Sequence, residues 1–334
     1  MNIQASTGIE SPGVVGCNDF NDNILTDYFG WRCAMLRSTL WLLLFFFSLL
    51  PAHAASDNTQ PPTLETIART GTIKLGYADR NLPFSYLGTG TEPIGYSIEL
   101  CLRVADSIKR RLGLPELKVE FVKRTPSNRI TLLNDGTMDM ECVASTNTEE
   151  RRKAVWFSYS HFITGTRYVA LKSSGLKTVA DLAGRTVVVT TGTINISQLN
   201  VLNRKLGLNI AVLQNDSTEG SFDMVTENRA SAFVMDDILL RSFVAETGRP
   251  DDYVISDEYL APPQPYGLML RHGDTGFRDA VNEALGQIYA SGEIETIYDK
   301  WFNAPIAPDG INLKRPLPGD LKEAFRRPVD TTAE

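Results

Sequence analysis

Short apolar strand patterns alternate with helical patterns along most of the chain, and this alternation restricts the fold more than any other feature. Residues 72–77 are typical of a strand, residues 98–112 carry apolar side chains on one helical face, and residues 118–124 alternate as a second strand. A short helix over 127–136 and a strand over 137–143 complete a β-α-β-α-β series. Such a series predicts a parallel sheet flanked by helices.

A second series of the same kind follows and is inserted into the first. Its expected elements are a helix over 178–184, strands over 185–190, 209–215 and 230–236, and helices over 195–207 and 221–229. The chain then returns through 264–274 to two helices, over 276–292 and 293–302. We therefore predict a two-lobed α/β protein in which each lobe is a mostly parallel sheet flanked by helices. Two crossings, near Thr164–Tyr168 and Pro262–Tyr266, would form a hinge.

The N-terminal region has the pattern of a signal peptide. Arg37 precedes an apolar run from Leu40 to Phe47, and "PAHAAS" then supplies the small residues of a cleavage site between Ala54 and Ala55. The pattern predicts secretion into a bacterial periplasm, with an uncleaved membrane anchor as the alternative. Met35 lies directly before the segment, so an incorrectly chosen upstream start codon would explain residues 1–34.

These patterns give the following domain organisation. The expected parts are an upstream extension plus signal peptide (1–54), a linker (55–63), lobe 1 (64–165 and 264–325), lobe 2 (166–263) and a C-terminal tail (326–334).

Charge and motif content exclude several classes of function. A net charge of −7 argues against a nucleic-acid partner, because phosphate binding needs a basic face. No zinc-spaced Cys/His cluster, G-x-S-x-G elbow, P-loop or G-x-G-x-x-G is present, so we expect no metal and no cofactor. Cys101 and Cys142 are the two cysteines after the cleavage site, and they form either one disulfide or two buried free thiols.

Two strand-to-helix junctions carry candidate ligand contacts. In "ASTNTEERR", Arg151 and the unpaired N–H groups of a helix starting near Thr146 would attract a carboxylate, although a capped helix with a solvated arginine is the alternative. In "VVVTTGTIN", the loop from Thr191 to Thr193 offers hydroxyl and amide donors, and Gly192 allows close backbone approach. The alternative there is an ordinary β-to-α loop.

Three further positions complete the candidate site. Asp236 ends an apolar strand and is suited to an ammonium group, whereas Asp237 is expected to cap a helix. Arg129 is either a second anion contact or a surface residue. Phe84 would either enclose the aliphatic part of a ligand or pack in the core.

Taken in order, these segments resemble the periplasmic solute-binding proteins of polar amino-acid ABC importers, nearest the glutamate/aspartate-binding branch. The resemblance covers roughly Leu64 to Phe325 and rests on "TLETIARTGTIKLGY", "GYSIEL", "SNRITLLNDGTMDMEC", "STNTEERRKAVWFS", "TVADLAGRTVVVTTGT", "SAFVMDDILL" and "YDKWFNAPI". It implies a type II fold that closes on an L-amino acid as a monomer and delivers it to an inner-membrane permease.

The resemblance also implies roles for individual residues. Arg151 and Thr146 would hold the α-carboxylate, and Asp236 would hold the α-ammonium. Arg129 and the loop from Thr191 to Thr193 would make further ligand contacts.

The chain departs from this branch at positions that would face the ligand's side chain. Ala78 stands where dicarboxylate-binding relatives have an arginine, Thr218 stands where they have a histidine, and Pro126 and Ala144 replace expected serines. Arg80 would compensate for Ala78 only with a reshaped loop. Since an unpaired buried carboxylate costs several kcal/mol, glutamine or asparagine is an alternative ligand.

Two other functions fit the same scaffold. A periplasmic enzyme resembling cyclohexadienyl dehydratase would use Glu141 or Asp139 as a general acid or base. However, prephenate has no ammonium group to pair with Asp236. A ligand-sensing subunit would share the binding site and differ in its membrane partner. We therefore predict a binding protein that is not an enzyme.

Overall fold

The computed structural model describes residues 62–331, which all belong to one compact unit. The predicted signal peptide, the alternative start at Met35 and most of the linker lie outside these residues. The first described element is helix α2 (Thr63–Thr70). None of the helices within 62–331 is long and apolar enough to cross a membrane.

The first sheet has five strands and contains the predicted β-α-β-α-β series. Its spatial order is β5 (Lys118–Lys123), β1 (Thr72–Tyr77), β6 (Met140–Glu141), β14 (Met269–Arg271) and β7 (Val155–Phe157). Strand β1 pairs in parallel with both β5 and β6, as the series predicts. Strand β14, which comes from the returning chain, pairs antiparallel with β6 and β7.

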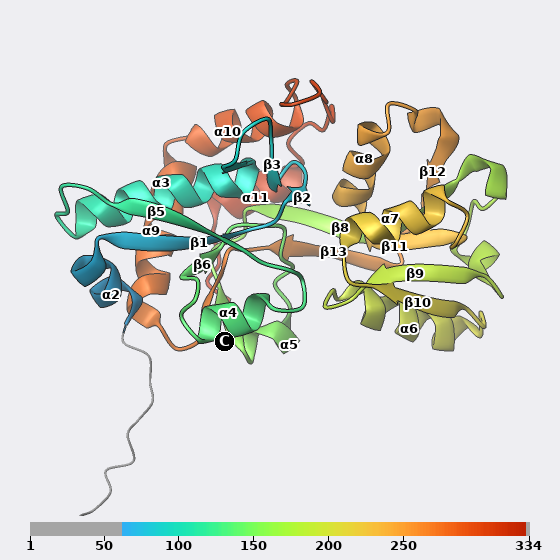
Figure 1. The fold of residues 1–334 in the computed structure, drawn as a ribbon, viewed down its shortest axis with the longest axis horizontal. Helices are drawn as coiled ribbons and strands as arrows, with labels where there is room; N and C mark the ends of the chain where they lie inside the picture. Colours follow the sequence, from blue (N-terminus) through green and yellow to red (C-terminus); the bar gives the residue numbers. More distant parts are fainter. Residues whose placement is uncertain (1–61, 332–334) are drawn as a thin grey trace, which may run out of the picture. The chain divides into compact units, whose positions relative to one another are not determined.

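Five helices belong to the first lobe, and α3, α9 and α10 bury the apolar faces that the sequence indicates. The five are α3 (Tyr96–Arg111), α4 (Arg129–Asn134), α5 (Glu149–Arg152), α9 (Thr275–Ala290) and α10 (Glu293–Phe302). Helices α3, α9 and α10 pack against one another (Figure 1). A disulfide joins Cys101 of α3 to Cys142, which directly follows β6, with 6.1 Å between the two Cα atoms. It therefore fixes the start of the turn that leads to α5.

The second sheet has six strands and contains the inserted series. Five follow the order β10 (Ala211–Asn215), β9 (Thr186–Thr190), β11 (Ala232–Asp236), β8 (Phe162–Leu171) and β12 (Tyr253–Ile255), while β13 (Ala261–Tyr266) also pairs with β8. Its helices are α6 (Asn195–Leu206), α7 (Thr218–Thr226) and α8 (Asp237–Glu246). Helices α6 and α7 cover opposite faces of this sheet (Figure 1).

Short 3₁₀ helices occupy three connections around the second sheet. They are η2 (Lys172–Ser174), η3 (Val179–Leu182) and η4 (Pro250–Asp252). The helix expected over 178–184 is thus a single 3₁₀ turn, held by a capping box between Thr178 and Asp181.

Both sheets are mixed, which corrects the expectation that they are mostly parallel. The chain passes from the first sheet to the second along β8 and returns along β13, so these neighbouring strands run in opposite directions. Strand β8 is also antiparallel to β11 and β12. The parallel pairs are those within each of the two β-α-β series, namely β1 with β5 and β6, and β9 with β10 and β11.

Two parts of the fold were not predicted from the sequence. Strands β2 (Arg80–Asn81), β3 (Ser85–Leu87) and β4 (Pro93–Ile94) form a small antiparallel sheet. Helix α11 (Gly319–Arg326) follows a long irregular connection after α10. Beneath them, the rings of a buried aromatic cluster stack or meet edge to face: Phe84, Tyr96, Phe162, Tyr266, Tyr298 and Phe302.

Candidate functional site

Arg151 folds back over the turn that precedes it. Its Nη1 donates to the Thr146 carbonyl at 2.9 Å, and its Nη2 donates to the Gly192 carbonyl at 3.4 Å. Helix α5 is a single turn, and the Thr148 hydroxyl already caps the Arg151 N–H. The Arg151 guanidinium is therefore the cationic group of this turn that reaches the Gly192 loop, and its own backbone N–H is not free for a ligand. Burial lowers the pKa of Arg151 to about 9, which leaves it charged at neutral pH.

Arg129 is a buried residue of helix α4 and contacts the same carbonyl. Its Nη2 donates to the Gly192 carbonyl at 3.0 Å and its Nη1 donates to the Ser145 hydroxyl at 3.2 Å. The Ser145 hydroxyl in turn donates to Glu141 at 2.5 Å, and Arg124 pairs with Glu141 at 2.7 Å. The Arg129 Nε has no hydrogen-bond partner among the described residues. Arg129 is thus an anchored internal cation and not a surface residue.

The Glu141 carboxylate is fully buried between these arginines. Burial alone would raise its pKa, but the charges of Arg124 and Arg129 and the Ser145 hydrogen bond hold that pKa below its usual value. Glu141 therefore stays ionised and has no proton to give as a general acid. Asp139, the other acid considered for catalysis, accepts from the backbone N–H of Lys74 near the start of β1, at the opposite end of that strand from Ala78.

Asp236 ends strand β11 and faces neutral hydrogen-bond donors. The Asn195 amide donates to Oδ1 at 3.0 Å, and the Tyr266 hydroxyl donates to Oδ2. Burial raises the pKa of Asp236, whereas these two hydrogen bonds and the charges of Arg151 and Arg129 act in the opposite direction. The structure thus brings Asp236 within electrostatic range of both arginines.

Asp237 does not cap helix α8, which corrects the sequence interpretation. Asp236 occupies the N-cap position without a side-chain cap bond, and Asp237 is the first helical residue. The Asp237 carboxylate instead pairs with Arg241 at 3.0 Å and with Arg315 at 3.1 Å. Adjacent aspartates therefore have different partners, because one faces neutral groups and the other faces arginines.

The loop from Thr190 to Thr193 presents a carbonyl to the first lobe. The Thr193 hydroxyl donates to the Thr190 carbonyl at 2.7 Å, and the Thr191 N–H donates to Asn215 at 2.9 Å. Gly192 has φ +79°, and a Cβ built there would lie 2.7 Å from the backbone of Pro126. The two threonines therefore bond within their own lobe, whereas the backbone of Gly192 touches the other.

Three further predicted contacts occupy buried or half-buried positions. Phe84 is fully buried and meets the Tyr266 ring edge to face at 5.4 Å, so it supports the tyrosine that binds Asp236. Ala144 lies half-buried in the turn after β6. Thr218 is buried at the first residue of helix α7.

Arg80 does not stand in for the arginine that is missing at position 78. Its guanidinium pairs with Glu219 at 3.1 Å and with Glu246 at 3.0 Å, both on the second lobe. The Ala78 N–H donates to the Ser85 hydroxyl, so this backbone donor is not free for a ligand.

Sequence reasoning missed three residues that build the centre, and it considered Glu141 only as a catalytic acid or base. Arg124 pairs with Glu141, whose carboxylate accepts from the Ser145 hydroxyl that binds Arg129, and Asn195 and Tyr266 hold Asp236. Asn195 directly follows the "TTGTI" loop, a position where a buried amide was a detectable signal. Tyr266 lies on the returning strand β13, and its approach to Asp236 depends on the antiparallel pairing of β13 with β8.

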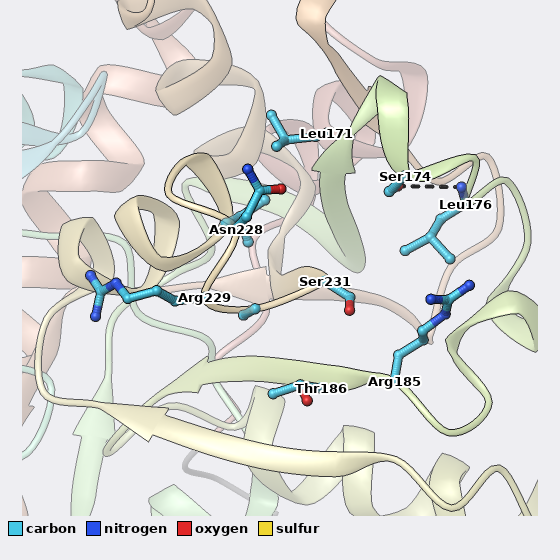
Figure 2. A pocket seen from close by; sticks show the side chains of 10 residues that line it. Leu171, Ser174, Leu176, Arg185, Thr186, Asn228, Arg229 and Ser231 are labelled. Carbon is cyan, nitrogen blue, oxygen red and sulfur yellow. Dashed lines mark hydrogen bonds between the residues drawn. The ribbon is translucent and has the colours of Figure 1, made fainter.

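A pocket of about 230 Å³ lies elsewhere on the second lobe (Figure 2). Its lining includes Arg185 and Thr186 at the start of β9, whereas the Gly192 loop follows the other end of that strand. In Figure 2 the Arg229 side chain points away from the Arg185 side of the pocket. This pocket is therefore separate from the Arg151 and Asp236 centre.

The centre contains no metal-ligand set. No group of three or more His, Cys, Asp or Glu side chains that would hold a metal occurs within residues 62–331. Two anchored guanidiniums and one buried carboxylate instead suit a ligand with both charges.

Comparisons with known proteins find relatives that are named for binding amino acids. The chain is 44% identical over 293 residues to the L-glutamate/L-aspartate-binding protein of Pseudomonas aeruginosa, covering 86% of this chain and 95% of the relative. It is 36% identical over 283 residues to the glutamate/aspartate import solute-binding protein of Escherichia coli, covering 83% and 92%. These relatives are binding proteins and not enzymes, and so is this chain.

A solved structure supports the fold. An ancestral amino acid-binding protein, described as a precursor of cyclohexadienyl dehydratase, superposes with a TM-score of 0.61 at 27% identity, covering 72% of this chain and 99% of its own. The two-lobed α/β fold class is thereby confirmed. The model of the bacterial extracellular solute-binding proteins, family 3, matches residues 73–304, and the chain therefore belongs to that family.

Proposed function

We propose that the protein is the extracytoplasmic binding component of an ABC importer for L-glutamate and L-aspartate. The names of both relatives support this ligand class, and the name of the Escherichia coli relative supports an import role over a sensing role. Delivery to an inner-membrane permease by a monomer follows from the same assignment. Residence in the periplasm rests on the predicted signal peptide, together with the extracellular assignment of the family.

The charge of the buried centre is the observation that carries the choice of ligand. Arg124, Arg129 and Arg151 act electrostatically on Glu141, and Arg151 and Arg129 also act on Asp236. Three guanidiniums against two carboxylates leave one positive charge. An acidic amino acid has a net charge of about −1 at neutral pH. Its binding would neutralise the centre, whereas glutamine would leave one buried charge uncompensated.

Each charged group of the ligand has a partner of opposite sign. Arg151 and Thr146 hold the α-carboxylate, and Asp236 holds the α-ammonium. Arg129 holds the side-chain carboxylate, since it is the second buried guanidinium at the Gly192 carbonyl and its Nη1 lies 4.0 Å from the Glu141 carboxylate, too far for a close ion pair. The Gly192 loop closes over these contacts through its backbone.

L-glutamine and L-asparagine form the second candidate class. The observation in their favour is the absence of a cation at position 78, together with the use of Arg80 in ion pairs with Glu219 and Glu246. With Ala78 and Thr218 in place, the side-chain carboxylate depends on Arg129 for its charge partner.

Calorimetry with the four amino acids tests the proposal. We expect L-glutamate and L-aspartate to bind more tightly than L-glutamine and L-asparagine. Arg129→Met should weaken glutamate binding by about 10-fold or more and glutamine binding much less, because one charge-assisted contact contributes roughly 1.5–3 kcal/mol. Arg111→Met is the matched control, since Arg111 is exposed and pairs with Glu283.

Two results would overturn the proposal in different ways. Tighter binding of glutamine than of glutamate would refute the charge argument and favour the second class. No binding of any of the four amino acids would refute the ligand assignment altogether.

A further inference from the structure

The polypeptide continues past the part of the chain that the family model matches. The match ends at residue 304, whereas the described structure extends to Thr331. Helix α11 anchors this C-terminal segment (residues 305–331) to the first lobe. Its buried Phe325 packs on the Tyr289 ring of α9 with 4.9 Å between ring centroids.

Arg315 extends from the C-terminal segment toward the second lobe. Its backbone N–H donates to the Phe302 carbonyl at the end of α10, and its guanidinium lies over the Phe162 ring of the aromatic cluster. The Nη1 of the same guanidinium donates to Asp237 at 3.1 Å. One residue therefore links α10 of the first lobe, through its backbone, to the first turn of α8 in the second lobe, through its side chain.

Asp237 has more cationic partners than its own charge requires. The carboxylate is 2% exposed and lies 3.0 Å from Arg241 Nε, 3.5 Å from Arg167 Nε and 3.1 Å from Arg315 Nη1. Arg167 and Arg241 belong to β8 and α8, so they accompany the second sheet, whereas Arg315 comes from the C-terminal segment. Two guanidiniums would still neutralise Asp237 without Arg315. The pair between Arg315 and Asp237 therefore contributes mainly a connection between the lobes, and adds little to the neutralisation of Asp237.

Asp237 is joined by one peptide bond to the proposed ammonium contact. Asp236 is the N-cap residue of α8, with φ −66° and ψ 132°, and Asp237 begins the helix. Any restraint on the first turn of α8 is passed directly to the Asp236 backbone. The far end of the C-terminal segment also contacts the site, because the Asn147 amide next to Thr146 donates to the Thr331 hydroxyl at 2.9 Å.

We propose that Arg315 is a positioning residue for amino-acid binding: its pair with Asp237 holds the first turn of α8, and with it Asp236, in register with the first lobe. This inference rests on the proposed function only in taking Asp236 as a ligand contact. Arg315 itself does not touch the ligand. Its effect is on the retention of a bound amino acid, since it adds a contact between lobes near the site.

The test compares Arg315→Met with Arg241→Met. Both variants remove one guanidinium from the same carboxylate and keep a long apolar stem, but Arg241 links only residues of α8. We expect Arg315→Met to raise the dissociation rate of L-glutamate by about 10-fold and Arg241→Met to change it by less than about 3-fold. Arg315→Lys should restore part of the loss. A role limited to neutralising Asp237 would lower the melting temperature in both variants without this difference in rate.

A ligand-free measurement separates this inference from the proposed function. Hydrogen exchange of the amides in residues 238–241 should be faster in Arg315→Met than in Arg241→Met, whether or not an amino acid binds. Equal exchange in the two variants, or equal glutamate dissociation rates, would overturn the positioning role. If the wild type binds no acidic amino acid but the two variants still differ in exchange, the ligand assignment is refuted. The role of Arg315 in holding the first turn of α8 is then retained.

Discussion

The turn that carries Arg151 and the junction that carries Asp236 hold opposite charges in the same manner. Arg151 hydrogen-bonds to two backbone carbonyls, and Asp236 accepts from an amide and a phenol. Both charges therefore have neutral partners. By contrast, Glu141 and Asp237 are each paired with arginines at 3.1 Å or less. The difference separates charges that are available to a ligand from charges that maintain the fold.

This distinction explains why neighbouring residues differ in function. Asp236 and Asp237 share a strand end and a helix start, yet one is held by dipoles and the other by full charges. A carboxylate with neutral donors keeps an unneutralised charge in a poorly solvated place, and a ligand ammonium removes that cost. The same reasoning applies to Arg151 and a ligand carboxylate.

The largest expected effect comes from removing the available cation. Arg151→Ala should weaken binding of L-glutamate by about 100-fold or more, because a carboxylate would lose charge-assisted hydrogen bonds that together contribute roughly 3 kcal/mol. Isothermal titration calorimetry measures the change. Lys153→Ala is the control, since Lys153 lies on the same turn, is exposed and pairs with Glu150. Unchanged affinity in Arg151→Ala would show that Arg151 is not the cation that binds the ligand carboxylate.

Replacing the available anion should have a somewhat smaller effect that depends on pH. Burial raises the pKa of Asp236, so in the free protein it takes up a proton at a higher pH than an ordinary aspartate does. An ammonium group binds the ionised form, and the wild-type affinity should therefore fall as the pH is lowered through that raised pKa. Asp236→Asn should weaken binding by about 10-fold to 100-fold and lose this component of the pH dependence.

Calorimetry between about pH 7 and about pH 5.5 provides the measurement for this second prediction. The side chain of L-glutamate stays largely ionised over that range, since its ordinary pKa is about 4.3. Equal pH profiles for the wild type and Asp236→Asn would contradict a contribution of Asp236 titration to binding over this range.

The smallest expected effect comes from adding a cation where the chain lacks one. Ala78→Arg should raise the ratio of glutamate affinity to glutamine affinity by about 10-fold, because a second guanidinium near the side-chain carboxylate would share its charge. Ala78→Met controls for the added bulk. A ratio that moves equally in both variants would show that position 78 acts through volume and not charge.

Local patterns predicted much of the fold. Strand β1 spans Thr72–Tyr77 and helix α10 spans Glu293–Phe302, both as the sequence indicates, because alternation and helical periodicity are strong there. The direction of β13 and β14, and so the mixed sheets, depends on how the chain returns between lobes. That is a tertiary property without a local signal.

The candidate site was predictable in its charges but not in their partners. Arg151 and Asp236 stand out because polar residues directly follow apolar strands. The Arg315 partner of Asp237 was missed, because Arg315 is 78 residues away in the sequence and reaches it through an irregular segment. The net positive charge of the centre depends on Arg124, whose burial at the end of β5 no pattern in the sequence indicated.

We expect the contact at Gly192 to limit the size of the ligand. Main-chain atoms of Gly192 and Pro126 meet there without room for even a methyl group, so no side chain can adjust the spacing of the lobes at that point. An amino acid one methylene too long would keep the Gly192 carbonyl away from Arg129 and Arg151, and the hydrogen bonds from both guanidiniums would be lost together. Backbone contact would thus convert a small excess in length into a large loss of affinity.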